Sequence, residues 1–224
     1  MKSIFERDFV QVRDHFPHLT YEWNTEHKTW CVTGELDICD TEGVYWNTFG
    51  IVLLVPESYP HCIPVLIEKT EIIPRDIDWH VSPEGICCMD IGHNLIILSK
   101  KGINLTDFIT NKVYSFFANQ LYKLEKQCYA GEEYGHHLQG VMQYYKEELN
   151  LLTPDIMVTF ITRILNKSGI GRNAQCPCGS GKKVKKCHLI TIEALKLLGS
   201  KKISTDLENI NEYLKSDKDI VSCH

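Results

Sequence analysis

The stretch PRDIDWHVSPEGICCMDIG, residues 74–92, separates two kinds of pattern along this chain of 224 residues. It is rich in Pro, Asp, Ser and Gly and has no hydrophobic period, which predicts a long loop. Long loops in compact domains usually carry function, and this one contains the adjacent cysteines Cys87 and Cys88. The loop lies between a region of β pattern and a region of helical pattern, so its position decides the fold class.

The residues before this loop favour one helix followed by strands. Ser3 and Glu6 form a capping-box pattern ahead of a periodic apolar run, so we expect a helix that ends before Pro17. Three later stretches contain β-branched and aromatic residues and are expected to be strands: residues 28–39, 44–55 and 64–69.

The residues after the loop favour helices. Asn104 or Thr106 can cap a helix that runs to about residue 124, and the same apolar spacing recurs over residues 138–149. A further helix is expected over residues 153–165, since it opens with an N-cap threonine and a proline. A helix, antiparallel strands, a long loop and then helices predict an α+β fold.

The composition is that of a globular protein. Hydrophobic residues make up 43% of the chain. No apolar stretch approaches the roughly 20 residues that a membrane span needs, and the first residues lack the apolar region of a signal peptide. We therefore expect a cytoplasmic protein without a membrane partner.

Charge is unevenly placed. The chain has 24 Lys and Arg against 29 Asp and Glu, a net charge of −5. Residues 156–192 contain seven of the basic residues and no acidic one, which leaves −12 for the remainder. This change in charge along the chain indicates a second module.

The ten cysteines are distributed in a way that favours metal binding and catalysis over disulfides. Three of them are compressed into one Lys-rich segment and two are adjacent, which suits a reducing compartment. Four others have no ligand spacing and are expected to be packed thiols: Cys31, Cys39, Cys62 and Cys128. Cys223 and His224 end the chain in what we expect to be a frayed tail.

The segment from Cys176 to His188 reads CPCGSGKKVKKCH. It offers three thiols and an imidazole, which is the ligand set of a tetrahedral structural zinc site. The glycines allow the chain to fold back sharply, and the surrounding lysines favour deprotonated thiols. These residues therefore predict bound Zn²⁺, the alternative being free cysteines in a basic loop.

With its lead-in, residues 171–173, this segment closely resembles the SEC-C motif, the zinc-binding tail also found on the SecA translocation ATPase. The resemblance covers residues 170–188 and implies contact with other macromolecules. It implies zinc ligation by Cys176, Cys178, Cys187 and His188. The basic surface could instead contact RNA phosphates, for example on a ribosome.

The loop itself offers a thiol with His80 upstream and carboxylates nearby, which suggests a cysteine nucleophile. Packed thiols beside a surface histidine are the alternative, since free cysteine is among the most buried residue types. Trp79, next to His80, could shield a thioester from water.

Residues 49–65, FGIVLLVPESYPHCIPV, together with Cys88-Met-Asp-Ile91, are similar to the core of ubiquitin-conjugating (UBC) enzymes. Residues 131–140 look like the segment that follows the active site in bacterial members. The resemblance covers about residues 1–152 and implies a UBC fold with Cys88 as the catalytic thiol. It gives four further candidate site residues: His80, Asp90, His136 and His137.

The sequence departs from the family in the His-Pro-Asn loop, because Val81 and Ser82 stand where the family has Pro and Asn. In the family the Asn serves the oxyanion or its loop. Either another donor acts here, with His80, His136 or His137 as candidates, or amide formation is impaired. His136 and His137 could equally cap a helix.

The resemblance implies a transferase that carries a protein C-terminus as a thioester and passes it to a protein acceptor. A separate activating enzyme or other acyl source would supply the donor. Bacterial proteins of this type occur in anti-phage operons, where the acceptor is a nucleotidyltransferase resembling cyclic GMP-AMP synthase. Two alternatives stay open: an inactive UBC-fold scaffold, and an adaptor whose zinc module binds a ribosome, a chaperone or another protein.

The predicted organisation has four parts. They are a UBC-like domain over residues 1–152, a bridging helix over 153–168, a SEC-C zinc motif over 169–190, and a helical, partly mobile tail over 191–224.

Overall fold

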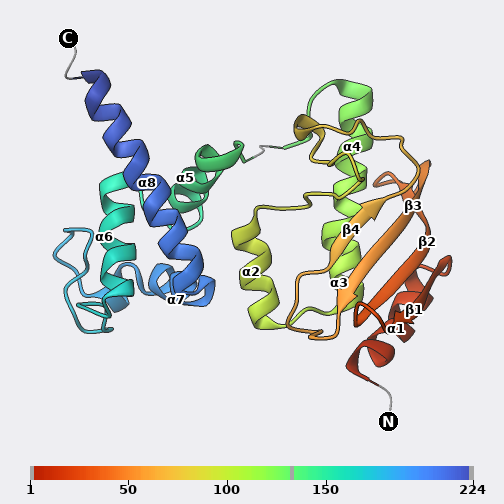
Figure 1. The fold of residues 1–224 in the computed structure, drawn as a ribbon, viewed down its shortest axis with the longest axis horizontal. Coiled ribbons are helices and arrows are strands. Elements are labelled where there is room, and N and C mark those ends of the chain that lie inside the picture. The colour runs from red at the N-terminus through yellow and green to blue at the C-terminus, as the bar shows by residue number, and fades with distance from the viewer. Residues whose placement is uncertain (1–2, 132–133, 222–224) are drawn as a thin grey trace. The chain divides into compact units, whose positions relative to one another are not determined.

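The computed structural model describes residues 3–131 and 134–221, with side chains up to residue 215, and its chain forms two compact units, residues 1–133 and 134–224. Figure 1 shows the strands in the first unit and only helices and loops in the second. The first unit contains α1 (Ile4–His15), β1 (Leu19–Asn24), β2 (Thr29–Cys39), β3 (Tyr45–Pro56), β4 (Val65–Glu68), the 3₁₀ turn η1 (Ile77–Trp79), α2 (Gly92–Lys101), α3 (Leu105–Phe108), the π-helical turn η2 (Ile109–Tyr114) and α4 (Ser115–Lys126). The second contains α5 (His137–Glu147), α6 (Pro154–Leu165), the 3₁₀ turn η3 (Val184–Lys186), α7 (Leu189–Leu198) and α8 (Ser200–Val221).

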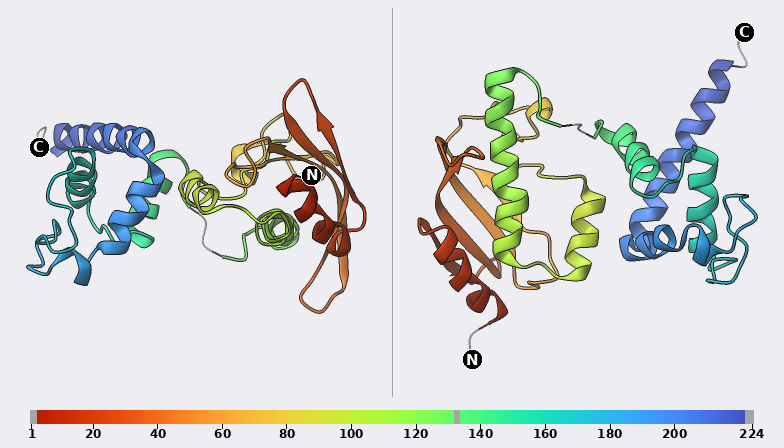
Figure 2. Two further views of the ribbon diagram at one scale, coloured as in Figure 1. Left: turned by 90° about the horizontal axis from the view of Figure 1, so that it is seen from below. Right: turned by 180° about the vertical axis from the view of Figure 1, so that it is seen from behind.

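The four strands form one antiparallel sheet in the order β1-β2-β3-β4. Along β3, Phe49, Ile51, Leu53 and Val55 are buried, and the residues between them are only partly covered. This alternation is typical of a sheet that packs on one face. Figure 2 shows the helices of the first unit on one side of the sheet.

Aromatic rings join the helices to that buried face. Phe5 of α1 stacks on Trp30 of β2 with ring centroids 4.6 Å apart. Phe117 of α4 stacks on Phe49 of β3 at 4.2 Å. Burial of such large side chains supplies most of the free energy that holds a helix to a sheet.

Several expected elements are confirmed. The Ser3 hydroxyl accepts the Glu6 amide at 3.1 Å, the Glu6 carboxylate accepts the Ser3 amide at 2.7 Å, and α1 ends before Pro17. The three expected strands correspond to β2, β3 and β4. Strand β1 was not expected from the sequence, because Leu19 is its one fully buried residue and its pairing with β2 decides its structure.

Helix α2, which follows the long loop directly, was not expected either. The four consecutive apolar residues 95–98 have no helical period, so the pattern gave no helix there. The next helix begins as expected, since the Asn104 side chain accepts the Asp107 amide at 3.0 Å. It continues through the π turn into α4.

The second unit begins at residue 134, whereas the sequence analysis placed the end of the first domain at residue 152. Helix α5 belongs to the second unit because the Tyr145 hydroxyl donates to the buried Asp206 carboxylate of α8 at 3.0 Å. Lys202 forms an ion pair with the same carboxylate at 2.8 Å. The expected helix over residues 153–165 is confirmed as α6, with Thr153 as its N-cap.

The chain is thus a mixed α+β protein with a four-stranded antiparallel sheet. The expected tail after residue 191 consists of α7 and α8, and the frayed end expected at Cys223 and His224 lies outside the described residues. Among the described helices, none combines the length and apolar character needed to cross a membrane.

Candidate functional site

A tight hairpin brings the C-terminal cysteines together. Gln175 and Lys183 form an antiparallel bridge, and the Cys176 amide donates to the Lys182 carbonyl at 2.8 Å. Between them Gly179 and Gly181 adopt φ of +78° and +72°, a region that residues with a side chain disfavour. The hairpin therefore folds Cys176 and Cys178, on its first arm, back toward the residues that follow η3.

The four predicted ligands lie together. One ligand atom from each of Cys176, Cys178, Cys187 and His188 falls within 4.8 Å of all the others. The Cys178 and Cys187 sulfurs are 3.5 Å apart, and His188 Nδ1 lies 3.3 Å from the Cys176 sulfur and 3.1 Å from that of Cys187. Tetrahedral zinc with Zn–S bonds of about 2.3 Å places its sulfurs about 3.8 Å apart, so the cluster fits a closed four-ligand site.

The other ring nitrogen of His188 contacts the connection between α5 and α6. His188 Nε2 lies 3.2 Å from the Asn150 carbonyl oxygen, which fixes Nε2 as the donor and leaves Nδ1 to face the thiols. The Thr191 hydroxyl donates to the Leu149 carbonyl at 2.9 Å. The His188 ring lies 5.1 Å from that of Phe160 on α6. The connection between α5 and α6 is therefore attached to the ligand cluster.

The thiols of the cluster differ in their environments. Burial raises the pKa of Cys176 to about 11. Burial also disfavours the Cys178 thiolate, but hydrogen bonds with Ser180, Cys176 and Cys187 outweigh it and lower the pKa of Cys178 to about 6. The Ser180 oxygen lies 3.2 Å from the Cys178 sulfur and 3.3 Å from that of Cys187, so one hydroxyl contacts two of the ligands.

Four basic side chains lie within the cluster's own segment. Lys182, Lys183, Lys185 and Lys186 are all exposed, and none forms an ion pair with a residue that the structure describes. Three thiolates around a divalent cation would carry one net negative charge, which these ammonium groups favour.

In the first unit, the loop with the paired cysteines extends the sheet beyond β4. Ile86 forms an antiparallel bridge with Ile67 of β4, and Cys87 forms another with Val81. The Cys87 amide donates to the Leu66 carbonyl at 2.9 Å. We call residues 80–82 and 85–88 the cysteine ladder.

The two thiols of the ladder differ in exposure. Successive side chains of a strand point to opposite faces, so Cys87 turns inward with Val81 while Cys88 turns outward. Cys87 is 6% exposed and Val81 2%, whereas Cys88 is exposed. Cys88, the thiol that the resemblance gives as catalytic, is therefore the exposed one of the pair.

An ion pair that the sequence analysis missed lies beneath the ladder. Glu68 is 1% exposed, and its carboxylate lies 2.6 Å from a guanidinium nitrogen of Arg75. The Glu68 amide donates to the Gly85 carbonyl at 2.9 Å, and a Cβ at Gly85 would come within 2.5 Å of the Glu68 carbonyl oxygen. The glutamate occupies an inward position of β4, a placement that could have indicated a buried partner.

Two predicted site residues lie on either side of Cys88. The Cys88 amide donates to the His80 carbonyl at 2.8 Å, so the two backbones are adjacent, and His80 has φ of +54°. Asp90 accepts from the Asn94 side chain at 3.0 Å and forms an ion pair with Lys112 of the π turn at 2.6 Å. Asp90 therefore anchors the loop to the helix, a contact that the sequence analysis did not foresee.

His136 and His137 belong to the other compact unit, at the start of α5. His136 is the N-cap residue, but its side chain forms no capping hydrogen bond. Of the four thiols expected to be packed, Cys62 is buried and Cys31 and Cys39 are half-buried. Cys128 is exposed, contrary to expectation, because it lies after α4 has ended.

Comparison with known proteins identifies the hairpin cluster. Residues 172–189 match the SEC-C motif, a motif of the zinc-binding type. No curated protein matches the chain. The match contains all four residues of the cluster, so the motif and the geometry agree on the same site.

We expect alkylation to distinguish the two adjacent thiols. Burial raises the pKa of Cys87 to about 12, so at pH 8 only about one Cys87 in ten thousand is a thiolate. Iodoacetamide should modify Cys88 at least about tenfold faster than Cys87, measured by mass spectrometry of the peptide that contains both. In guanidinium chloride the two rates should become similar, and equal rates in the folded chain would contradict the ladder geometry.

Proposed function

We propose that the first unit is a UBC-like acyl carrier and that Cys88 is its nucleophile. The order of a helix, a four-stranded antiparallel sheet, a cysteine loop and a long helix supports this reading. The observation that carries it is the ladder, which exposes Cys88 on an ordered, hydrogen-bonded backbone and buries Cys87. A nucleophile that must meet large protein substrates needs both accessibility and a fixed position.

The proposed reaction has two transfers. The Cys88 thiolate attacks an activated acyl group on a separate carrier; a C–S bond to Cys88 forms, and the carrier leaves as its own thiolate. An acceptor amine then attacks the thioester; a C–N bond forms, the C–S bond breaks, and Cys88 returns to its thiolate as the amine proton passes to solvent or a base. The activating enzyme, the nucleotidyltransferase acceptor and a role in anti-phage defence remain predictions from the resemblance.

We expect Cys88→Ala to abolish the covalent carrier state. Intact mass spectrometry without reductant, after co-expression with the neighbouring genes, should show a thiol-labile protein adduct on the wild type and none on the variant. Cys87→Ala is the matched control, because Cys87 is the adjacent but buried thiol.

An adduct that persists in Cys88→Ala would move the nucleophile elsewhere. Absence of any adduct on the wild type, with the partner proteins shown to be expressed, would favour the inactive UBC-fold scaffold. Such a scaffold should tolerate Cys88→Ala without loss of function.

We also propose that the Cys/His cluster binds Zn²⁺ as a structural site. The four ligands leave no coordination position for substrate, and the outer nitrogen of His188 already contacts a backbone carbonyl. The metal would supply a rigid crosslink between the hairpin and α7.

The purified chain should contain one zinc ion, measured by elemental mass spectrometry. Cys187→Ser should remove most of it and lower the melting temperature of the second unit by about 10 °C or more, because zinc binding contributes much of the folding free energy of such modules. Cys128→Ser is the control, since Cys128 is also an exposed cysteine but lies outside the cluster. Full zinc content in Cys187→Ser would contradict the site.

A second candidate function rests on the basic surface of the hairpin. Four exposed lysines lie within five residues and have no described ion-pair partner, as set out above. Such a surface attracts phosphates whatever the base sequence. We propose weak RNA binding here as the alternative role, in which the zinc module is the active surface of an adaptor.

Fluorescence anisotropy with a labelled single-stranded oligouridylate tests this role. Changing Lys182, Lys183, Lys185 and Lys186 to Gln should reduce affinity at least about tenfold and flatten its dependence on salt. The same change at four exposed lysines of the first unit is the charge-matched control: Lys28, Lys69, Lys100 and Lys101. Equal losses in both variants would indicate general charge attraction and contradict a dedicated surface.

A further inference from the structure

The residues directly before the cysteine ladder are held by side chains from α4 and the chain that follows it. Gln120 is 1% exposed, and its side-chain amide donates to the Trp79 carbonyl at 3.1 Å. The Lys123 ammonium donates to the Asp78 carbonyl. Both contacts reach the backbone of η1, which ends where the ladder begins at His80.

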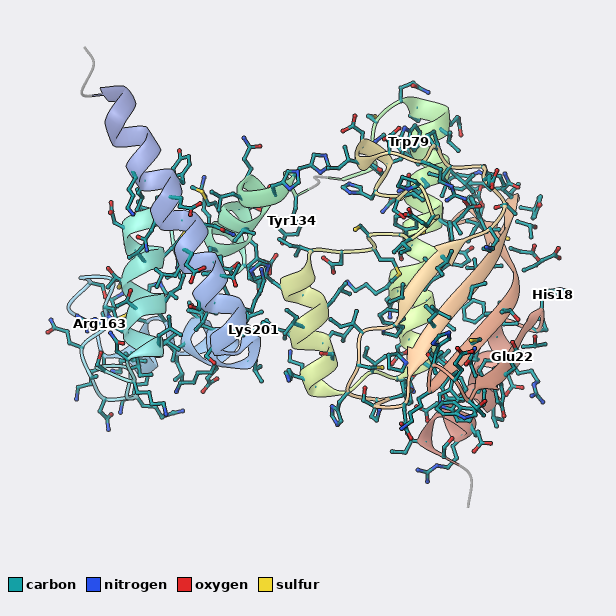
Figure 3. The ribbon with its side chains drawn as sticks, viewed as in Figure 1. His18, Glu22, Trp79, Tyr134, Arg163 and Lys201 are labelled. Atoms are coloured by element: carbon teal, nitrogen blue, oxygen red, sulfur yellow. The ribbon has the colours of Figure 1, made fainter. Side chains whose placement is uncertain are left out.

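Lys123 also lies between two aromatic rings. Its ammonium nitrogen is 4.6 Å from the centroid of the Trp79 ring and 4.1 Å from that of Tyr129. A cation over ring faces is attracted by their quadrupoles, the more so where water is partly excluded. Figure 3 shows Trp79 beside the C-terminal part of α4, the part that contains Lys123.

Tyr129 completes the arrangement. Its hydroxyl lies 3.2 Å from the Asp78 carbonyl and 3.3 Å from the Gln120 side-chain oxygen, and its ring centroid lies 6.0 Å from that of His80. We call Gln120, Lys123 and Tyr129 the α4 clamp. All three contact residues 78–80, whose last carbonyl accepts the Cys88 amide at 2.8 Å.

We propose that Lys123, at the centre of the α4 clamp, is a positioning residue for the Cys88 nucleophile. It acts through Asp78, Trp79 and His80, which fix the backbone opposite Cys88. The Asp90–Lys112 ion pair holds the chain on the other side of Cys88, so the continuous helix from α3 to α4 anchors the thiol from both flanks. The role in acyl transfer rests on the proposed function; the mechanical role does not.

The position of Cys88 depends on how firmly its loop is held. Cys88 is exposed, so packing around its own side chain does not fix it, and its position depends on the ladder and on what holds the ladder. A thioester reacts fast only when it meets its acceptor within a narrow range of distance and angle. A mobile loop would lose much of the rate that such positioning gives. A cation held by two rings and a carbonyl provides such support at a single point.

Variants of Lys123 and Lys126 test the proposal first. Lys123→Met keeps the length of the side chain but removes the charge and the donor, whereas Lys123→Arg keeps both. Lys126→Met is the matched control, because Lys126 lies in the same last turn, is 52% exposed and pairs with the exposed Glu125.

Hydrogen exchange measured by mass spectrometry is the first readout. We expect the peptide that spans residues 78–90 to exchange at least tenfold faster in Lys123→Met, with Lys123→Arg close to the wild type and Lys126→Met unchanged. Tyr129→Phe, which keeps the ring and loses the hydroxyl, should show a smaller increase of two- to threefold. It serves as the second variant if Lys123→Met does not fold.

The second readout is the yield of the thiol-labile adduct on Cys88. It should fall at least fivefold in Lys123→Met at an unchanged melting temperature and recover in Lys123→Arg. If the wild type forms no adduct, the proposed function fails while the exchange data still decide the clamp. Unchanged exchange in Lys123→Met, or equal effects of Lys123→Met and Lys126→Met, would overturn the proposal.

Discussion

The first unit depends on the pairing of the ladder with β4. Because the Gly85 carbonyl and the Cys87 amide bond to β4, the alternation of the sheet continues into the loop and sends one thiol inward and the next outward. A slip of one residue would exchange Cys87 and Cys88. The register is fixed on two sides, by the hydrogen bonds to β4 and by the Glu68–Arg75 ion pair packed against Gly85. The site is therefore a consequence of sheet register, extended beyond the last regular strand.

The second unit depends on a different constraint, the attachment of the ligand cluster to its helices. The hairpin has few apolar residues of its own, Val184 being the fully buried one. It is joined to the helices through His188, whose two ring nitrogens face the thiols and the Asn150 carbonyl. A small segment of this kind needs a crosslink in place of a core, which is the role that structural zinc commonly takes.

Elements whose structure is decided by residues close together in the sequence were predicted correctly. The capping box at Ser3, the cap at Asn104 and the β-branched and aromatic residues of β3 all act within a few residues, and each predicted element is confirmed. The Cys/His cluster was predictable because its ligands lie within a single short segment. The ion pair of Asp90 with Lys112 was not, since it joins elements that only the tertiary fold brings together. The same applies to α5, whose membership of the second unit depends on Asp206 of α8.

Val81 and Ser82, which stand where the UBC pattern has Pro and Asn, have defined places in the ladder. Val81 points inward with Cys87, so its side chain lies on the face opposite to Cys88. The Ser82 hydroxyl donates to the Glu84 carboxylate at 2.9 Å and accepts the Ile86 amide at 3.1 Å, so it stabilises the turn of the ladder. Neither residue offers a donor to an oxyanion at the thioester. In the proposed reaction the two steps therefore make separate demands: carrying the acyl group needs Cys88 and a fixed ladder, whereas transfer to an amine needs a donor from elsewhere, such as the acceptor complex.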